Sequence, residues 1–200
     1  MINIDKLYDH LADKGFQEPD TGNLFFPAYI YTYAPEKEYE IRNQLMLLGQ
    51  KLKRPNNFLD CLMVNIYEEL IDYFKHEHFT GNSLFDQIIA KETEDPLEAN
   101  NWIRDEISDG NFYPRFKQKV KDYFQPESEK RVYLIIYGFG SAFPYLRASE
   151  FLKNTESLIK EFKVLLFYPG SYEKTRYSLF GLSEDDHMYR ANNLNIFLGE

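Results

Sequence analysis

The chain has a single cysteine, Cys61, among its 200 residues. One thiol excludes a disulfide framework and cannot hold a zinc ion without other ligands. No apolar run approaches the roughly 20 residues that a membrane helix requires. The first residues carry charges throughout, whereas a signal peptide has an apolar core. We therefore expect a soluble, cytoplasmic protein with no membrane partner.

Basic residues are fewer than acidic ones. Lysine and arginine number 23 against 32 aspartates and glutamates, which gives a formal net charge of -9. This balance argues against a protein whose whole surface grips nucleic acid or anionic lipid. Hydrophobic residues nevertheless make up 44% of the chain and aromatic residues 17%, which excludes a disordered chain. A chain of this length can bury roughly 70% of the surface that its unfolded form exposes.

Strand-like and helix-like segments alternate along much of the chain. The clearest helix follows Pro35, with Ile41, Leu45, Leu48 and Leu52 on one apolar stripe. Such alternation is typical of parallel strands joined by crossover helices. We expect strands at 27–33, 58–65, 131–138, 163–168 and 194–198, the fourth of them ended by Pro169 and Gly170. The sequence predicts a three-layer α/β sandwich with a mostly parallel sheet of about five strands.

Residues 79–125 show helical patterns and no convincing strand. We interpret them as a helical insertion between strands two and three of a single α/β domain, residues 1–200. Seven acids and one arginine fall between Glu92 and Asp109. A basic row follows: Arg115, Lys117, Lys119 and Lys121. On a helix these four form two neighbouring rows, either the charged outer face of an amphipathic helix or a contact for a nucleic-acid backbone.

The phosphate-binding loops of nucleotide enzymes are missing. The third strand runs into GFGSAFPYLR, where Gly138 and Gly140 match two glycines of the dinucleotide fingerprint but Phe143 occupies the third position. After the first strand the chain reads APEKEYEIR instead of GxxxxGK[ST], so the usual cradle of amides and lysine is absent. We expect no cofactor. A cryptic nucleotide site near Gly138 and Gly170 stays open as an alternative.

No complete catalytic set is apparent either. Ser141 and Ser171 each follow a glycine near a strand end, but neither lies in GxSxG. None of the four histidines has a sequence context typical of a serine triad. The run Asp185-Asp186-His187 contains metal-ligand types, but adjacent residues rarely all face one ion, and an acidic turn after Gly181 is the simpler explanation. We expect a protein with no metal and no enzymatic activity.

Aromatic and arginine residues are dense in the tail, FYPGSYEKTRYSLFGLSEDDHMYRANNLNIF. This composition is typical of a recognition surface, although the segment could instead fold back over the sheet edge. Asp186 and Arg190, four residues apart, could also form an internal ion pair. The residues that we expect to bind a partner are Arg147, Tyr172, Phe180, Asp186, Tyr189 and Arg190.

The tail motifs FYPGSY, SLFGL and DDHMYRA closely resemble the signature of the BrxB family of BREX phage-defence systems. Met188 stands where that family commonly has a tyrosine. Two upstream segments, GFGSAFPYLRASEFL and FFPAYIYTYAPEKEYEIR, resemble further family patterns, with Arg42 as the family arginine. The resemblance covers most of the chain and is weakest over residues 79–124.

This resemblance implies a small cytoplasmic defence component with no established catalytic activity. Such members are thought to bind other BREX proteins, notably the PglZ-type protein of the alkaline-phosphatase superfamily. The strand-helix order also resembles a P-loop or Rossmann-like core stripped of its phosphate-binding loop, since strand three ends in Tyr137-Gly138 instead of a metal-binding aspartate. We therefore expect a non-catalytic adaptor that binds nucleic acid only indirectly or weakly. A nucleic-acid-binding module and a cryptic nucleotide binder are the alternatives.

Overall fold

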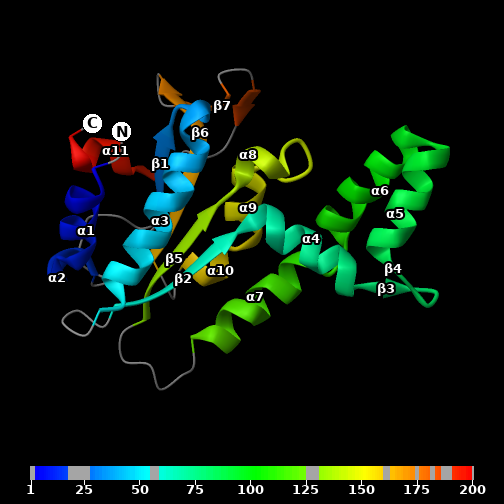
Figure 1. The fold of residues 1–200 in the computed structure, drawn as a ribbon, viewed down its shortest axis with the longest axis horizontal. Helices are drawn as coiled ribbons and strands as arrows, with labels where there is room; N and C mark the ends of the chain where they lie inside the picture. Colours follow the sequence, from blue (N-terminus) through cyan, green and yellow to red (C-terminus); the bar gives the residue numbers. More distant parts are fainter. Residues whose placement is uncertain are drawn as a thin grey trace.

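The computed structural model describes residues 3–17, 28–54, 59–124, 131–159, 163–173, 176–180, 183–185 and 191–199. Within them a central sheet lies between two layers of helices (Figure 1). Five strands run parallel in the order β2-β5-β6-β1-β9. They are β1 (Ala28–Tyr33), β2 (Asp60–Asn65), β5 (Arg131–Tyr137), β6 (Lys163–Glu173) and β9 (Asn192–Asn193). The arrangement confirms the predicted three-layer α/β sandwich with a mostly parallel sheet.

The central strands are apolar because both of their faces are covered. The side chains from Tyr133 to Ile136 in β5 are fully buried, and those from Val164 to Tyr168 in β6 are at most 1% exposed. Leu134 is in register with Val164, and Tyr29 of β1 with Leu165. Near-continuous apolar runs of this kind are expected in a parallel sheet with helices on each side.

One face of the sheet is covered by α4 (Ile66–His76), α7 (Phe112–Tyr123), α8 (Phe139–Ala142) and α9 (Ala148–Asn154). Its centre is a group of buried phenylalanines. The ring of Phe151 lies 5.3 Å from Phe116 and 5.7 Å from Phe139, measured between centroids. Aromatic side chains supply a large apolar area each, so this group contributes strongly to the core.

The other face is covered by α1 (Ile4–Ala12), α3 (Glu38–Leu52) and α11 (Leu194–Leu198). The stripe predicted on α3 is confirmed, since Ile41, Leu45, Leu48 and Leu52 are all buried. Helix α3 follows a single 3-10 turn, η1 (Pro35–Lys37), which begins at the predicted proline. Short helices α2 (Lys14–Gln17) and α10 (Glu156–Ile159) complete the layers.

The predicted end of the fourth strand at Pro169 and Gly170 is wrong. Strand β6 continues to Glu173 and turns back through β7 (Arg176–Leu179) and β8 (Ser183–Asp185) in an antiparallel extension. Pro169 is the last β6 residue paired with β1, opposite Tyr33, and Gly170 is the first paired with β7. Pro169, which has no backbone N–H to donate, therefore lies where β6 changes from one partner strand to another. Proline is tolerated in a sheet where the hydrogen-bond ladder is irregular.

The predicted fifth strand at 194–198 is also wrong, because that segment is helix α11. The Asn193 side chain caps the helix by accepting the N–H of Asn195 at 2.9 Å. Leu194 and Leu198, one helical turn apart, are both buried. The fifth strand is instead the two-residue β9, which pairs with β1.

Between β2 and β5 the chain is helical as expected, with one departure. A small hairpin of β3 (His78–Phe79) and β4 (Asn82–Ser83) precedes the helices. Thr80 and Gly81 at its tip both have positive φ, as a two-residue hairpin turn requires. The helices α5 (Leu84–Glu94) and α6 (Pro96–Asp109) stand away from the sheet (Figure 1), whereas α7 packs on it. The boundaries 79–125 for an insertion within one domain stay a prediction.

The helices that the structure describes include none long and apolar enough to cross a membrane.

His10 on α1 gives the fold a pH dependence. Its ring lies 4.2 Å from that of Phe16, and its Nε2 is buried with no hydrogen-bond partner among the described residues. Burial lowers the pKa of His10 below its usual 6.5; nearby Asp13 opposes this shift and Lys163 adds to it. Because the folded state favours the neutral ring, its contribution to stability is complete above pH 6.5 and is lost as the pH falls below that value.

We therefore expect His10→Gln to weaken the loss of stability on acidification. Denaturant titrations at about pH 7.5 and about pH 5.5 would measure the free energy of unfolding of both proteins on either side of the histidine range. His78→Gln serves as the control, because His78 is exposed. An unchanged pH dependence in His10→Gln would contradict the assignment.

Candidate functional site at the carboxyl edge of the sheet

The carboxyl ends of β1, β2, β5 and β6 meet at one edge of the sheet, because these strands are parallel. The chain leaves β1 into α3 on one face and leaves β5 into α8 on the other. In open α/β sheets ligands bind outside the carboxyl ends of the strands, where the connections diverge to opposite faces. This edge is therefore the first place to look for a functional site.

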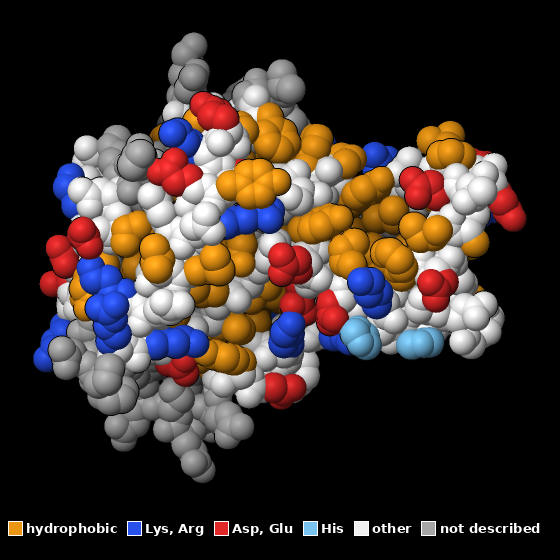
Figure 2. Space-filling model, in the orientation of Figure 1, with side chains coloured by type: hydrophobic (Ala, Val, Ile, Leu, Met, Phe, Trp, Pro, Cys, Tyr) orange, Lys and Arg blue, Asp and Glu red, His pale blue; other side chains and the backbone are white. Residues whose placement is uncertain are grey.

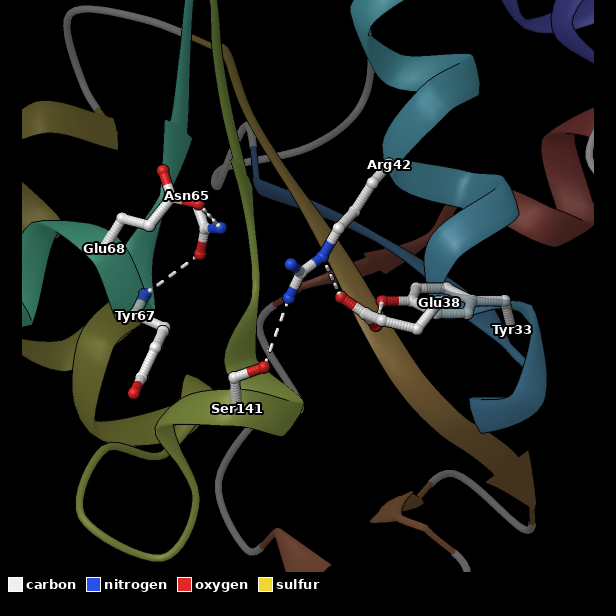
Figure 3. A network of polar contacts seen from close by, with 7 residues as sticks. All are labelled: Tyr33, Glu38, Arg42, Asn65, Tyr67, Glu68 and Ser141. Atoms are coloured by element: carbon white, nitrogen blue, oxygen red, sulfur yellow. Dashed lines mark hydrogen bonds and ion pairs between the residues drawn. The ribbon is translucent and has the colours of Figure 1, made fainter.

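A line of polar contacts joins the two layers across this edge (Figure 3). Tyr33, the last residue of β1, donates its hydroxyl to Glu38 Oε2 at 2.5 Å. Arg42 donates from Nε to Glu38 Oε1 at 2.8 Å and from Nη2 to Ser141 Oγ on α8 at 3.1 Å. We call these four residues the edge brace. The edge brace joins the N-terminal part of α3 to α8, at the point where the connections from β1 and β5 leave to opposite faces of the sheet.

A second group lies at the end of β2. Asn65 is 7% exposed and caps α4, where its Oδ1 accepts the N–H of Tyr67 at 3.2 Å. Its Nδ2 donates to Glu68 Oε1 at 2.8 Å. Gly138, at the end of β5, has φ +88° and lies so close to Asn65 that an added Cβ would collide with the Asn65 side chain. The glycine is thus required for a left-handed turn and a close approach.

The electrostatics of the edge are unfavourable for phosphate. The segment after β1 carries Glu36, Glu38 and Glu40, where a phosphate-binding protein directs backbone amides at its anion. Burial, with the charge of Glu38 as a further cause, raises the pKa of Tyr33. Burial and the charge of Glu68 likewise raise the pKa of Tyr137. Both phenols therefore stay protonated at neutral pH and are unsuited to act as bases.

Ser141 has a guanidinium partner in place of an imidazole. Its hydroxyl accepts from Arg42, while the described histidines lie elsewhere: His10 on α1, His76 at the end of α4 and His78 in β3. No group of three metal-ligand side chains occurs among the described residues. Among the described residues, the contacts at this edge join the two helical layers, and Ser141 has a guanidinium partner.

The predicted partner-binding residues are only partly placed. Phe180 is 36% exposed, has a positive φ, and lies edge-on to Phe143 with 6.2 Å between ring centroids. Tyr172 is half-buried and packs on Tyr177 at 4.7 Å. Arg147 is exposed at the start of α9. The remaining three lie outside the described residues: Asp186, Tyr189 and Arg190.

Phe180 and Phe143 form a small aromatic rim beside the edge brace. An added Cβ at Gly140 of α8 would lie 3.1 Å from Cζ of Phe180 and 2.9 Å from Cγ of Pro169. The base of the β6-β7 hairpin, where Pro169 and Phe180 lie, therefore rests directly on α8. The residue after Gly140, Ser141, belongs to the edge brace. We use the term hairpin rim for Phe143, Tyr172 and Phe180.

The basic row on α7 is half neutralised. Arg115 Nη1 lies 3.8 Å from Glu77 Oε2, and Lys119 forms an ion pair with Glu69 on α4. Lys117 is half-buried and Lys121 exposed. The opposite side of α7 is buried in the core through Phe112, Phe116 and Val120. These contacts favour the interpretation of α7 as an amphipathic helix with a charged outer face.

Sequence reasoning missed Tyr33, Glu38, Asn65 and Glu68. For two of them a signal was present, because Asn65 and Glu68 stand three residues apart, as in a capping box at the start of a helix. For the edge brace no local signal exists. Arg42 and Ser141 are 99 residues apart in sequence, and their contact depends on the strand order.

Comparison with known proteins gives one consistent result. The family model for BREX protein BrxB matches residues 62–194. A BREX protein BrxB of Bacillus cereus (strain H3081.97) is 22% identical over 191 residues, covering 96% of this chain and 95% of that protein. Another, of Escherichia coli O9:H4 (strain HS), is 23% identical over 168 residues, covering 83% of this chain and 76% of the relative. With two thirds of its length matched by the family model, the chain belongs to the BrxB family of BREX proteins.

Proposed function

We propose that this chain acts in BREX phage defence as a non-catalytic adaptor that binds other BREX components, the PglZ-type protein among them. Membership of the BrxB family supports the BREX role. The observation that carries the non-catalytic part is the edge brace. The edge of the sheet is where an α/β enzyme would hold its substrate. At this edge, Arg42 instead donates hydrogen bonds to Glu38 and Ser141.

The same observation bears on the relation to nucleotide-binding folds. A core of the P-loop type needs backbone amides and a lysine after its first strand. Here the segment after β1 reads Pro35-Glu36-Lys37-Glu38 and has no glycine, and its lysine pairs with Glu40. We therefore regard the sheet as a nucleotide-binding type of scaffold without its phosphate cradle. A nucleotide panel in a thermal-shift assay tests this, since a ligand at 100 times its Kd would add about 2.7 kcal/mol to the stability.

The adaptor would use the hairpin rim together with Arg147. Aromatic residues and arginine are enriched at protein interfaces, where a few residues supply most of the binding energy. The backbone of Phe180 is held by the hydrogen bond from its N–H to the carbonyl oxygen of Pro169, at 3.1 Å, and its ring packs edge-on to Phe143. A fixed aromatic side chain loses little conformational entropy on binding, so it is well suited to dock a partner.

A pull-down from cells that express the whole defence cluster tests the adaptor role. We expect the tagged chain to recover the PglZ-type protein, and the double variant Arg147→Glu, Phe180→Ser to recover at least about tenfold less, because both changes remove hot-spot residue types. Leu47→Ala is the matched control, since Leu47 is 62% exposed on α3. Recovery of the tagged chain always alone would refute the proposal.

The absence of catalysis has its own test. Purified protein should turn over neither ATP nor phosphoesters. Turnover that disappears in Ser141→Ala or Glu38→Gln would show that the edge brace is an active site and would overturn the non-catalytic assignment.

One observation keeps a nucleic-acid role as the second candidate. Among the described residues, Lys117 and Lys121 on α7 form no ion pair, unlike Arg115 and Lys119. If this row touches a phosphate backbone, duplex binding at low salt should fall steeply with added salt and with Lys117→Glu, Lys121→Glu. No binding at low salt would dispose of this candidate.

A further inference from the structure

A hollow of about 510 Å³ lies at the end of the molecule formed by the β3-β4 hairpin, α5 and α6. Phe79 and Trp102 are part of its lining and are 68% and 39% exposed. Figure 2 shows hydrophobic and acidic side chains next to each other at this end. The acidic residues that line the hollow are Glu77, Asp105, Glu106 and Asp109. The volume is that of a site for several side chains or a small ligand.

Part of the lining is held rigidly. Tyr73, which is 2% exposed, donates its hydroxyl to Glu106 and accepts the N–H of Asn111 at 3.1 Å. Gly110 leaves no room for a side chain, because a Cβ there would collide with the backbone of Glu106. These contacts fix the end of α6 against α4 and α7. The hollow is therefore preformed, which lowers the cost of binding.

Two of the four acids are not used in this internal bracing. Asp105 and Asp109 lie four residues apart on α6 and are both exposed. Neither forms an ion pair with another described residue, whereas Glu77 lies 3.8 Å from Arg115 and Glu106 bonds to Tyr73. His78 also lines the hollow, but no lysine or arginine does, so four acidic side chains stand against one basic side chain there. Its field is therefore negative, which repels phosphates and attracts cations.

The exposed rings of Phe79 and Trp102 indicate which class of ligand the hollow can bind. Trp102 already has a cation of the chain itself over its ring, since Lys91 Nζ lies 5.6 Å from the ring centroid and pairs with Glu98. Its exposed part therefore offers apolar contact to a ligand. Phe79 and Leu84 offer apolar contact next to the acids. A free metal ion would gain nothing from these apolar groups, and the described residues form no metal cluster.

We propose that this hollow docks a basic segment of a protein partner, in which arginine or lysine side chains alternate with apolar ones. Its cationic groups would pair with Asp105 and Asp109, while its apolar side chains contact Phe79 and Trp102. This deepens the proposed adaptor role by adding a second surface, distant in sequence from the hairpin rim. Charge complementarity is the argument for this occupant.

The experiment uses Trp102, which is the one tryptophan of the chain, as an intrinsic fluorescent reporter. The full-length protein is titrated with an amidated peptide of about 12 residues that repeats Leu-Arg, so that apolar and basic side chains alternate along it as the proposal requires. We expect a saturable change in fluorescence with a Kd on the order of 10 µM. The same peptide with glutamate in place of arginine should give none.

Matched variants assign the binding to the hollow. The double variant Asp105→Asn, Asp109→Asn should weaken binding of the peptide by about tenfold. Phe79→Ala should also weaken it, with no change in charge. The control is Glu92→Gln, Glu94→Gln, which removes the same charge from exposed positions of α5 outside the hollow. This control should bind as the unchanged protein does. Asp105 and Asp109 lie towards the carboxyl end of α6, where acids oppose the helix dipole, so their neutralisation should not impair folding.

Three outcomes would overturn the inference. A titration that does not saturate shows that no site exists. An equal loss in both double variants shows a general effect of net charge. A concentration-dependent dimer that Asp105→Asn, Asp109→Asn converts to monomer, measured by sedimentation, shows that the occupant is a second copy of the chain. The adaptor proposal fails separately, in the pull-down, because this titration contains no BREX partner and does not involve the hairpin rim.

Discussion

Phe151→Ala should lower the free energy of unfolding by about 3–5 kcal/mol, the range for truncating a fully buried phenylalanine. Phe151 on α9 is 0% exposed. Its ring contacts Phe116 of α7, Phe139 of α8 and Tyr113, with centroid distances of 5.3, 5.7 and 6.4 Å. Three helices meet on this one side chain, so no single helix can shift to fill the cavity that the substitution leaves.

Denaturant titrations of Phe151→Ala and of the unchanged protein measure this loss. Leu47→Ala is the control, because Leu47 is 62% exposed on a helix where alanine is equally favourable. That variant should differ from the unchanged protein by no more than about 0.5 kcal/mol. A loss below about 1 kcal/mol in Phe151→Ala, small for a core truncation, would mean that α9 is not part of the core.

Gly138→Ala should destabilise the protein by about 2–3 kcal/mol, for two reasons that add. A residue with a side chain at φ +88° costs about 1–2 kcal/mol in the left-handed region. The added methyl group must also displace the Asn65 side chain, and the loss of a helix cap costs about 1 kcal/mol. Denaturant titration again gives the value.

The chain contains a matched control for the first of these reasons. Gly81 has φ +93° but no atom within 4 Å of an added Cβ, so Gly81→Ala carries the conformational cost alone. Asn65→Ala removes the cap and the obstacle together, so Gly138→Ala should cost less in that background. If Gly138→Ala is no more harmful than Gly81→Ala, the close approach to Asn65 has no energetic weight.

Much of the fold could be predicted from the sequence because local patterns determine it. The near-continuous apolar run in β5 and the four-residue stripe on α3 are both buried as expected. The errors arose where a local pattern was ambiguous. Leu194 to Leu198 has the composition of a strand, but the Asn193 side chain caps it as a helix. Pro169 suggested an end, yet β6 only changes partners there.

The candidate site was less accessible to sequence reasoning. The motif around Gly138 was identified, but its role became clear only when Asn65, from another strand, was found beside it. The edge brace depends on the strand order, which brings α3 and α8 together, and no spacing along the chain encodes that order. Phe180 was identified from aromatic density and is 36% exposed, and its role in partner binding stays a prediction.

The strand order also has a consequence for how the protein is made. Strand β1 pairs with β6 on one side and with β9 on the other, and both are synthesised long after it. During synthesis, the tyrosine-rich segment from Ala28 to Tyr33 therefore has no strand to pair with until most of the polypeptide has left the ribosome. Parallel pairing between such distant segments is slow, and unpaired strands invite aggregation in the interval. A nascent chain released before Lys163 could not complete its sheet and would depend on chaperones to stay dispersed.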